Sequence, residues 1–108
     1  DQVEWRDGQP LAVLELTTTD EITDDVKESV AYRLWHQFSG KKLRYLARRM
    51  KVPFYVVLFT PDIDQFAVNA LSQEDAPWVD YSPSEYRSWL SSLPLPSGGT
   101  AAATTTSR

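Results

Sequence analysis

The chain of 108 residues contains no cysteine and only one histidine. Without cysteine there are no disulfides, no thiolate zinc site and no cysteine nucleophile. The lone histidine, His36, excludes a multi-histidine metal cluster, and we expect it to be a surface or boundary residue rather than a general base. No run approaches the roughly 20 apolar residues that span a bilayer, and no charged-then-apolar leader opens the sequence. These absences predict a cytoplasmic protein that does not enter a membrane.

Gly-rich phosphate loops, internal repeats and a Gly-x-Ser-x-Gly motif are also missing from the sequence, which gives serine-nucleophile hydrolysis no support. What is present suits one small core, because aromatic residues make up 12% of the chain and include four Trp. We expect a single domain over residues 1–93. Residues 94–108 are rich in Ser, Thr, Gly and Ala and predict a flexible tail, which suggests a further domain joined through it.

The charge is unevenly distributed along the chain. Residues 1–40 hold nine acids and three bases, and residues 52–108 hold six acids and two bases, whereas residues 41–51 hold six bases and no acid. The basic residues are Lys41, Lys42, Arg44, Arg48, Arg49 and Lys51. They surround an apolar stripe at 43, 46, 47 and 50, which predicts a helix that packs on one side and presents cations to phosphates on the other. The alternative is that these cations offset the acids of the first forty residues and complement the helix dipole.

The first seventeen residues read as a β-hairpin. Asp7-Gly8 predicts the turn, and the more apolar second strand carries Glu15 near its end. Because alternate residues of a strand share a face, Glu15 and Thr17 point the same way, while Leu14 and Leu16 point into the core. Together with Asp1, Glu15 would offer oxygen ligands to Mg²⁺ or Mn²⁺, which are hard cations.

A helix follows, capped at Thr23 or Asp24, and Gly40 is expected to end or kink it. Its apolar residues recur at three- and four-residue steps and define one buried face: Val26, Val30, Ala31, Leu34, Trp35 and Phe38. The basic helix comes next.

Residues 52–60 form the strongest strand of the chain, because they are continuously β-branched and aromatic between Pro53 and Pro61. Pro61-Asp62 turns the chain into a further strand over residues 65–71, residues 72–81 read as a polar loop, and residues 82–85 form a capping box before a short helix. The long helical connection between the strands of Glu15 and Val56 predicts a parallel crossover. The fold class is therefore α/β: a small mixed sheet of hairpin, helical crossover, central apolar strand and further strand, flanked by helices.

The pattern of Asp1, Gly8, Pro10 and residues 12–17, followed by helix and strand, resembles the PD-(D/E)xK nuclease superfamily over residues 1–71. The resemblance implies a restriction-endonuclease-like core that cuts DNA with Mg²⁺ or Mn²⁺. It also implies that Asp1, Glu15 and the Leu16 carbonyl hold the metal, and that Thr17 occupies the position of the family's lysine.

Thr17 departs from the family because it has no charge to polarise water. Lysine can migrate in such sites, and Lys27 or Arg33 on the next helix are the candidates to replace it. The family also usually has a helix before its first Asp, whereas this sequence begins at Asp1, so we expect either a trimmed fragment or an incomplete fold.

Several functional interpretations stay open from the sequence. The first is a metal-dependent endonuclease, and the second is a module that keeps the nuclease fold to bind nucleic acid or protein without catalysis. The third is a structural accessory domain. In an interpretation without any functional site, Asp1 is a solvated terminal acid, and Glu15 and Thr17 occupy the polar face of a half-buried strand. A homodimer is a further expectation, since many small nucleases dimerise.

Overall fold

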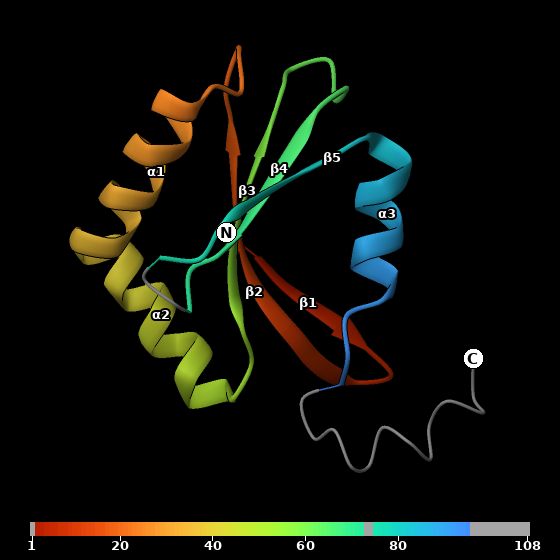
Figure 1. Ribbon diagram of the computed structural model, residues 1–108. Coiled ribbons are helices and arrows are strands. Elements are labelled where there is room, and N and C mark those ends of the chain that lie inside the picture. The colour runs from red at the N-terminus through yellow and green to blue at the C-terminus, as the bar shows by residue number, and fades with distance from the viewer. Residues whose placement is uncertain (1, 73–74, 96–108) are drawn as a thin grey trace.

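The computed structural model describes residues 2–72 and 75–95. They form a small mixed α/β domain with a five-stranded sheet and three helices (Figure 1). The strands lie side by side in chain order: β1 (Gln2–Arg6), β2 (Gln9–Thr18), β3 (Phe54–Phe59), β4 (Phe66–Ala70) and β5 (Trp78–Tyr81). Only β2 and β3 are parallel, and the other neighbouring pairs are antiparallel.

The hairpin of β1 and β2 forms as the sequence predicts. Asp7 and Gly8 both have positive φ, 55° and 78°, as a tight two-residue turn between right-twisted strands requires. The register of the hairpin shifts between Glu4 and Trp5, which marks a β-bulge or irregularity beside the turn.

The parallel crossover is also confirmed. Helices α1 (Asp24–His36) and α2 (Phe38–Met50) connect β2 to β3, and Glu15 pairs in register with Val56. The hydroxyl of Thr23 caps α1 by accepting a hydrogen bond of 3.2 Å from the backbone N–H of Val26. Lys51 ends α2 in the left-handed conformation, with φ of 60°.

The boundary between the two helices differs from the predicted one. The chain leaves helical geometry at Gln37, where φ is −87° and ψ is 159°, and Gly40 lies inside α2. A Cβ at position 40 would overlap the backbone carbonyl of Leu34, so Gly40 permits the close approach of the two helices. The glycine is needed for packing and does not terminate a helix.

The prediction of a polar loop over residues 72–81 is wrong for its last four residues. Trp78–Tyr81 form β5, which pairs antiparallel with β4 and brings Asn69 opposite Trp78. The capping box is confirmed: Ser82 and Glu85 exchange side-chain-to-backbone hydrogen bonds at the start of α3 (Pro83–Ser91).

Helices cover both faces of the sheet (Figure 1). Against α1 and α2 lies a core that includes Val13, Val56 and Leu58, and against α3 lies a second cluster that includes Leu14. Leu14 therefore points into a core, as predicted, and Leu16 packs against the same α3-side clusters. Leu95, which the sequence assigned to the tail, is only 6% exposed and belongs to that cluster. The rest of the predicted tail, residues 96–108, lies outside the described residues.

Candidate nucleic-acid interface and the Glu15 pocket

Glu15 and Thr17 lie on the face of the sheet that α1 and α2 cover. Both are half-buried, and their face is that of Val13, which packs in the core beneath these helices. The shared orientation of Glu15 and Thr17 follows from strand alternation, as predicted. Their surroundings differ from an open polar face, because helices lie above this side of β2.

The backbone of Leu16 points toward the outer side of β2. The N–H of Val13 donates to the carbonyl of Pro53, just before β3, and the N–H of Thr19, just after β2, donates to the carbonyl of Phe59, each at 3.0 Å. Odd-numbered residues of β2 therefore direct their peptide groups toward β3. Even-numbered residues direct theirs the other way, and pairing with the described part of β1 reaches only to Leu14. The carbonyl of Leu16 is therefore directed to the side of β2 on which the described residues pair only as far as Leu14.

Glu15 lines a pocket of about 250 Å³ beneath the first turns of α2. The other lining residues are Ser39, Lys42 and Leu43. Lys42 is exposed at the same time, so its side chain belongs both to the surface of α2 and to this pocket. The residues that line this pocket thus include one that carries a carboxylate, one that carries a hydroxyl and one that carries an ammonium group.

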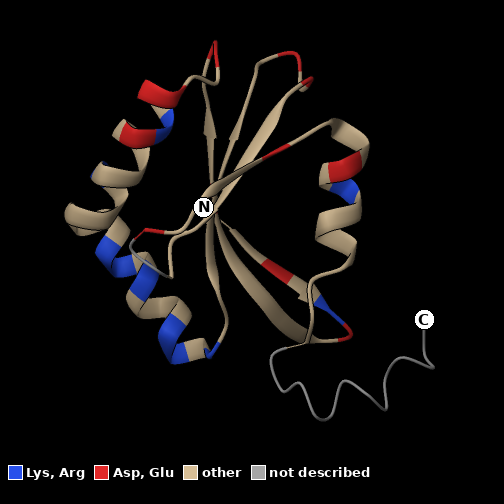
Figure 2. Cartoon of the chain, in the orientation of Figure 1, with Lys and Arg blue, Asp and Glu red and all other residues tan. Residues whose placement is uncertain are grey.

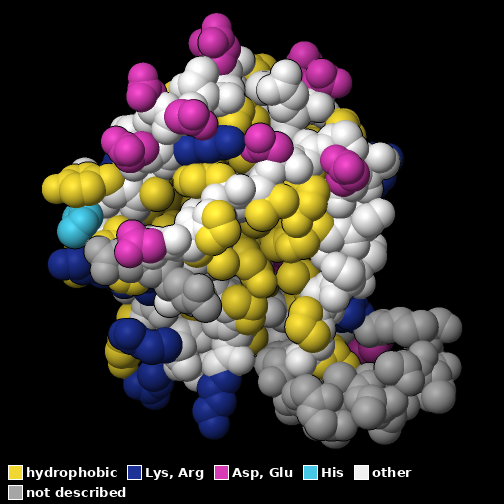
Figure 3. Space-filling view, in the orientation of Figure 1, with side chains coloured by type: hydrophobic (Ala, Val, Ile, Leu, Met, Phe, Trp, Pro, Cys, Tyr) yellow, Lys and Arg dark blue, Asp and Glu magenta, His cyan; other side chains and the backbone are white. Residues whose placement is uncertain are grey.

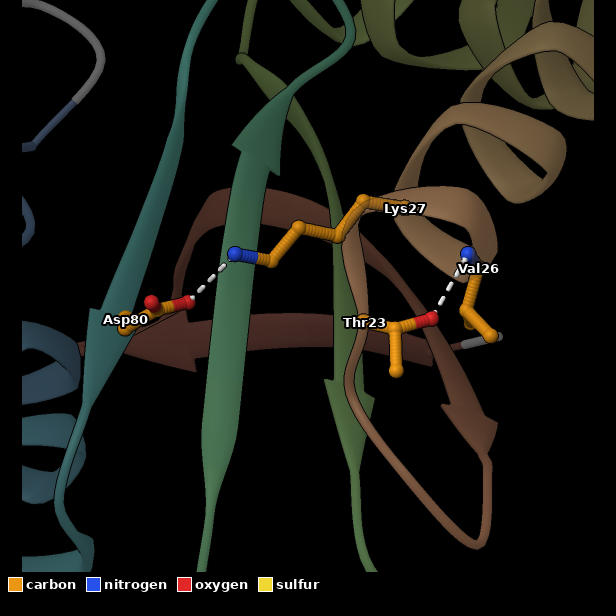
Figure 4. Close-up of polar contacts among 4 residues, drawn as sticks. All are labelled: Thr23, Val26, Lys27 and Asp80. Carbon is orange, nitrogen blue, oxygen red and sulfur yellow. Dashed lines mark hydrogen bonds and ion pairs between the residues drawn. The ribbon is translucent and has the colours of Figure 1, made fainter.

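Lys27 is not brought to this pocket. Its ammonium nitrogen lies 2.9 Å from an Asp80 carboxylate oxygen on β5, and the side chain extends across the sheet to reach it (Figure 4). Its partner strand β5 is three strands from β2, a separation of roughly 14 Å between the two strands. Arg33, the other predicted replacement for the missing lysine, is exposed near the end of α1.

The described residues offer oxygen ligands from β2, the Glu15 carboxylate and the Leu16 carbonyl, which suit a hard cation. Asp1, the other predicted ligand, lies outside the described residues. Within residues 2–72 and 75–95, no three His, Cys, Asp or Glu side chains group as a metal site would require. The described residues therefore fit part of a divalent-cation site, with open positions left for water or a further carboxylate.

The predicted basic residues gather on α2, as Figure 2 shows in blue, and dark blue side chains project from the same part of the molecule in Figure 3. Five are exposed: Lys41, Lys42, Arg48, Arg49 and Lys51. Arg44 differs, because its guanidinium carbon lies 3.8 Å from the centre of the Trp35 ring and the group donates a 2.6 Å hydrogen bond to the Trp35 carbonyl. Arg44 therefore joins α2 to α1, and the other five form the basic face.

The sequence analysis did not predict two exposed aromatic residues on α2. Phe38 was predicted to be buried but is 76% exposed, because the break at Gln37 ends the periodicity of α1. Tyr45 is 54% exposed. Leu46, predicted to lie in the apolar stripe of α2, is 41% exposed. One signal in the sequence could have indicated these exposed rings: Phe38 and Tyr45 are seven residues apart, or two helical turns, among the basic residues.

His36 is exposed, as expected, and its ring lies 4.3 Å from that of Tyr32, centre to centre. Among the described residues no helix has the length and apolar character needed to cross a membrane. Comparison of the chain with protein-family models, with curated proteins and with solved structures finds no match. Any functional conclusion therefore depends on the geometry of the chain itself.

Proposed function

We propose that this domain binds DNA along α2 and hydrolyses a phosphodiester at the Glu15 pocket with Mg²⁺ or Mn²⁺, as a nuclease-like enzyme. One observation carries the proposal: Lys42 belongs both to the exposed basic face and to the pocket that Glu15 lines. A phosphate attracted by α2 would therefore arrive beside the carboxylate. The overall acidity of the chain, with a net charge of −4, limits such attraction to this local face.

The order of elements around Glu15 supports the proposal. The hairpin of β1 and β2, the helical crossover and the parallel strand β3 agree with what a restriction-endonuclease-like core of the PD-(D/E)xK kind requires. In that arrangement the strand that carries Glu15 is held between a hairpin partner and a buried central strand. Since fold alone does not establish function, the chemistry of the pocket has to be tested directly.

Each residue of the pocket has a role in the proposal. The Glu15 carboxylate and the Leu16 carbonyl hold the cation from one strand, and Asp1 contributes a second carboxylate. A bound divalent cation supplies Lewis-acid activation of water and neutralises charge on the phosphate. Lys42 supplies the positive charge that Thr17 lacks, and it holds a phosphate oxygen at the mouth of the pocket. This assignment replaces Lys27, which is engaged by Asp80.

The first experiment compares the full chain with Glu15→Ala by Mn²⁺ titration calorimetry and a plasmid-nicking assay. We expect Mn²⁺ binding and nicking in the wild type and the loss of both in the variant. Glu21→Ala is the matched control, because Glu21 is an exposed acid in the connection between β2 and α1. Equal metal binding and nicking by wild type and Glu15→Ala would contradict the proposal.

The second experiment tests Lys42. Lys42→Ala should reduce the rate of nicking by about 10²-fold or more, as for other groups that stabilise developing charge at a reacting centre. Arg87→Ala is the control, because Arg87 is an exposed cation on α3, on the opposite face of the sheet. Equal reductions from both changes would indicate a loss of general attraction instead of a role in the pocket.

A non-catalytic module is the second candidate function, and Thr17 favours it, because an uncharged side chain stands where the resembled family has lysine. Such a module would bind nucleic acid or protein through the same fold, and Glu15→Ala would leave binding unchanged. Dimer formation and a further domain joined through the tail over residues 94–108 belong equally to both proposals. A cytoplasmic location is also part of both, and the lack of cysteine agrees with it.

A further inference from the structure

Four residues form a stripe along the outer surface of α2. They are Phe38, Lys42, Tyr45 and Arg49, at alternating steps of four and three residues. Residues at these steps share one face of a helix, so the stripe is continuous over about 16 Å. Aromatic and cationic side chains alternate along it. We call these four residues the aromatic–cationic stripe.

Contacts within the stripe hold each cation over the face of a ring. The Lys42 nitrogen lies 5.4 Å from the centre of the Phe38 ring, and the Arg49 guanidinium carbon lies 5.7 Å from that of Tyr45. Arg49 also donates a 2.8 Å hydrogen bond to the Tyr45 hydroxyl. Each cation thus covers one face of its ring, so a base would stack on the other face or displace the cation, which would stay within reach of the strand's phosphates.

The exposure of these rings is not required by the packing of α2. The opposite side of the helix contains Gly40 and Ala47, which are both buried, together with the half-buried Leu43 and Met50. Phe38 and Tyr45 keep 76% and 54% of their surface accessible on the outer side. Large apolar rings that contribute little to the core are available for a ligand.

We propose that the nucleic acid recognised by this domain is single-stranded, and that Phe38 and Tyr45 stack on its unpaired bases. This inference rests on the proposed binding of nucleic acid by α2. The rings are two helical turns apart, about 10 Å, and the cations between and beside them match a charged backbone. A duplex hides its base faces, so exposed rings would gain little from it, whereas every unpaired base offers a face for stacking.

The stripe also leads to the candidate site. Lys42 is a member of the stripe and a lining residue of the Glu15 pocket. A strand that follows the stripe therefore has a phosphate at the pocket mouth while a base contacts Phe38 or Tyr45. The substrate class that follows is a single-stranded segment or a single-stranded end of DNA or RNA.

The test measures fluorescence anisotropy with the full chain and labelled oligodeoxythymidine of about 20 nucleotides, a length that exceeds the usual site size of small single-strand-binding folds. A hairpin duplex of equal length and an oligouridine of equal length serve as the other probes. We expect oligodeoxythymidine to bind at least tenfold more tightly than the duplex. The oligouridine then distinguishes DNA from RNA as the source of the unpaired bases.

The variants test stacking while every charge of the stripe is kept. Tyr45→Ala should weaken binding of oligodeoxythymidine about tenfold, as the loss of one stacked base typically does, and Phe38→Ala should act similarly. Tyr45→Phe keeps the ring and should bind like the wild type. Trp5→Ala is the matched control, because Trp5 is a 59% exposed aromatic on β1, outside the stripe. Far-ultraviolet circular dichroism confirms that each variant is folded.

The outcomes distinguish this inference from the proposed function. Equal or tighter binding to the duplex, with no effect of Tyr45→Ala, would overturn the single-strand inference while leaving nicking at Glu15 intact. Tight binding to oligodeoxythymidine that depends on Tyr45, without Mn²⁺-dependent cleavage of either the plasmid or the oligodeoxythymidine, would support the inference and refute the nuclease. Binding to none of the probes would overturn both the single-strand inference and the proposed binding of nucleic acid by α2.

Discussion

The Arg6 guanidinium donates a 2.7 Å hydrogen bond to the backbone carbonyl of Leu93, two residues beyond the end of α3. The same group also donates to the carbonyls of Leu90 and Ser91, at 3.3 and 2.9 Å. A helix leaves its last carbonyls without partners and carries partial negative charge there, so an arginine from a neighbouring strand satisfies both needs. Arg6 thereby fastens α3 to the hairpin that carries Glu15.

Replacing Arg6 tests this connection. Arg6→Ala should lower the free energy of unfolding by about 2 kcal/mol, since several carbonyls of α3 lose a charged donor. Arg6→Lys should recover only part of this, because an ammonium group cannot match the fork of a guanidinium. Urea denaturation followed by circular dichroism measures both variants. Wild-type stability in Arg6→Ala would mean that the apolar contacts of α3 suffice to hold it.

Gly40 provides a second stability test, at the crossing of α1 and α2. Gly40→Ala should destabilise the domain by about 3 kcal/mol, because the added methyl group overlaps the Leu34 carbonyl and the helices must separate. Ser29→Ala is the control, because Ser29 is exposed on α1 and the change should be nearly neutral or slightly stabilising. A neutral Gly40→Ala, judged by the urea midpoint, would show that the two helices can shift without cost.

Local signals made much of the fold predictable from the sequence. The turn at Asp7-Gly8, the cap at Thr23 and the capping box at Ser82 each depend on a few neighbouring residues. The continuous apolar run around Val56 predicts a strand that is buried on both faces for the same reason. These elements follow from chemistry that operates within one short segment.

Non-local packing accounts for what the sequence did not predict. Residues 78–81 become a strand because β4 offers an edge for pairing, and nothing within the segment requires it. Phe38 is exposed because the chain breaks at Gln37, a residue with no strong tendency to end a helix. Likewise, strand alternation predicts the orientation of Glu15, but the arrival of Lys42 in its pocket depends on how α2 lies over β2.

Tyr86 makes the stability of the domain sensitive to high pH. Burial, with a smaller contribution from the negative charge of Glu4, raises the pKa of Tyr86 from 10.0 to about 12. The unfolded chain thus releases this proton at a lower pH than the folded one. The stabilising contribution is complete below pH 10 and is lost as the pH rises through about 12.

The measurement is the urea midpoint of wild type and Tyr86→Phe as a function of pH. Tyr86→Phe keeps the ring that stacks on Phe66 at 4.2 Å, and its midpoint should fall less steeply above pH 10. Tyr55→Phe should also flatten the curve, because burial raises the pKa of Tyr55 as well. Parallel curves for wild type and Tyr86→Phe would contradict the assignment to Tyr86.

The basic face of α2 makes a prediction about salt. If the exposed cations neutralise phosphates, affinity for an oligonucleotide falls linearly with salt on logarithmic axes, and each lost contact reduces the slope by about one. Lys41→Ala should show that reduction, whereas Arg87→Ala, on α3, should keep the wild-type slope. Arg44 is engaged by Trp35. Arg44→Ala should therefore lower the free energy of unfolding, measured by urea denaturation, and leave the salt slope close to that of the wild type. Anisotropy titrations over a series of NaCl concentrations separate these effects, and a slope that Lys41→Ala leaves unchanged would remove Lys41 from the interface.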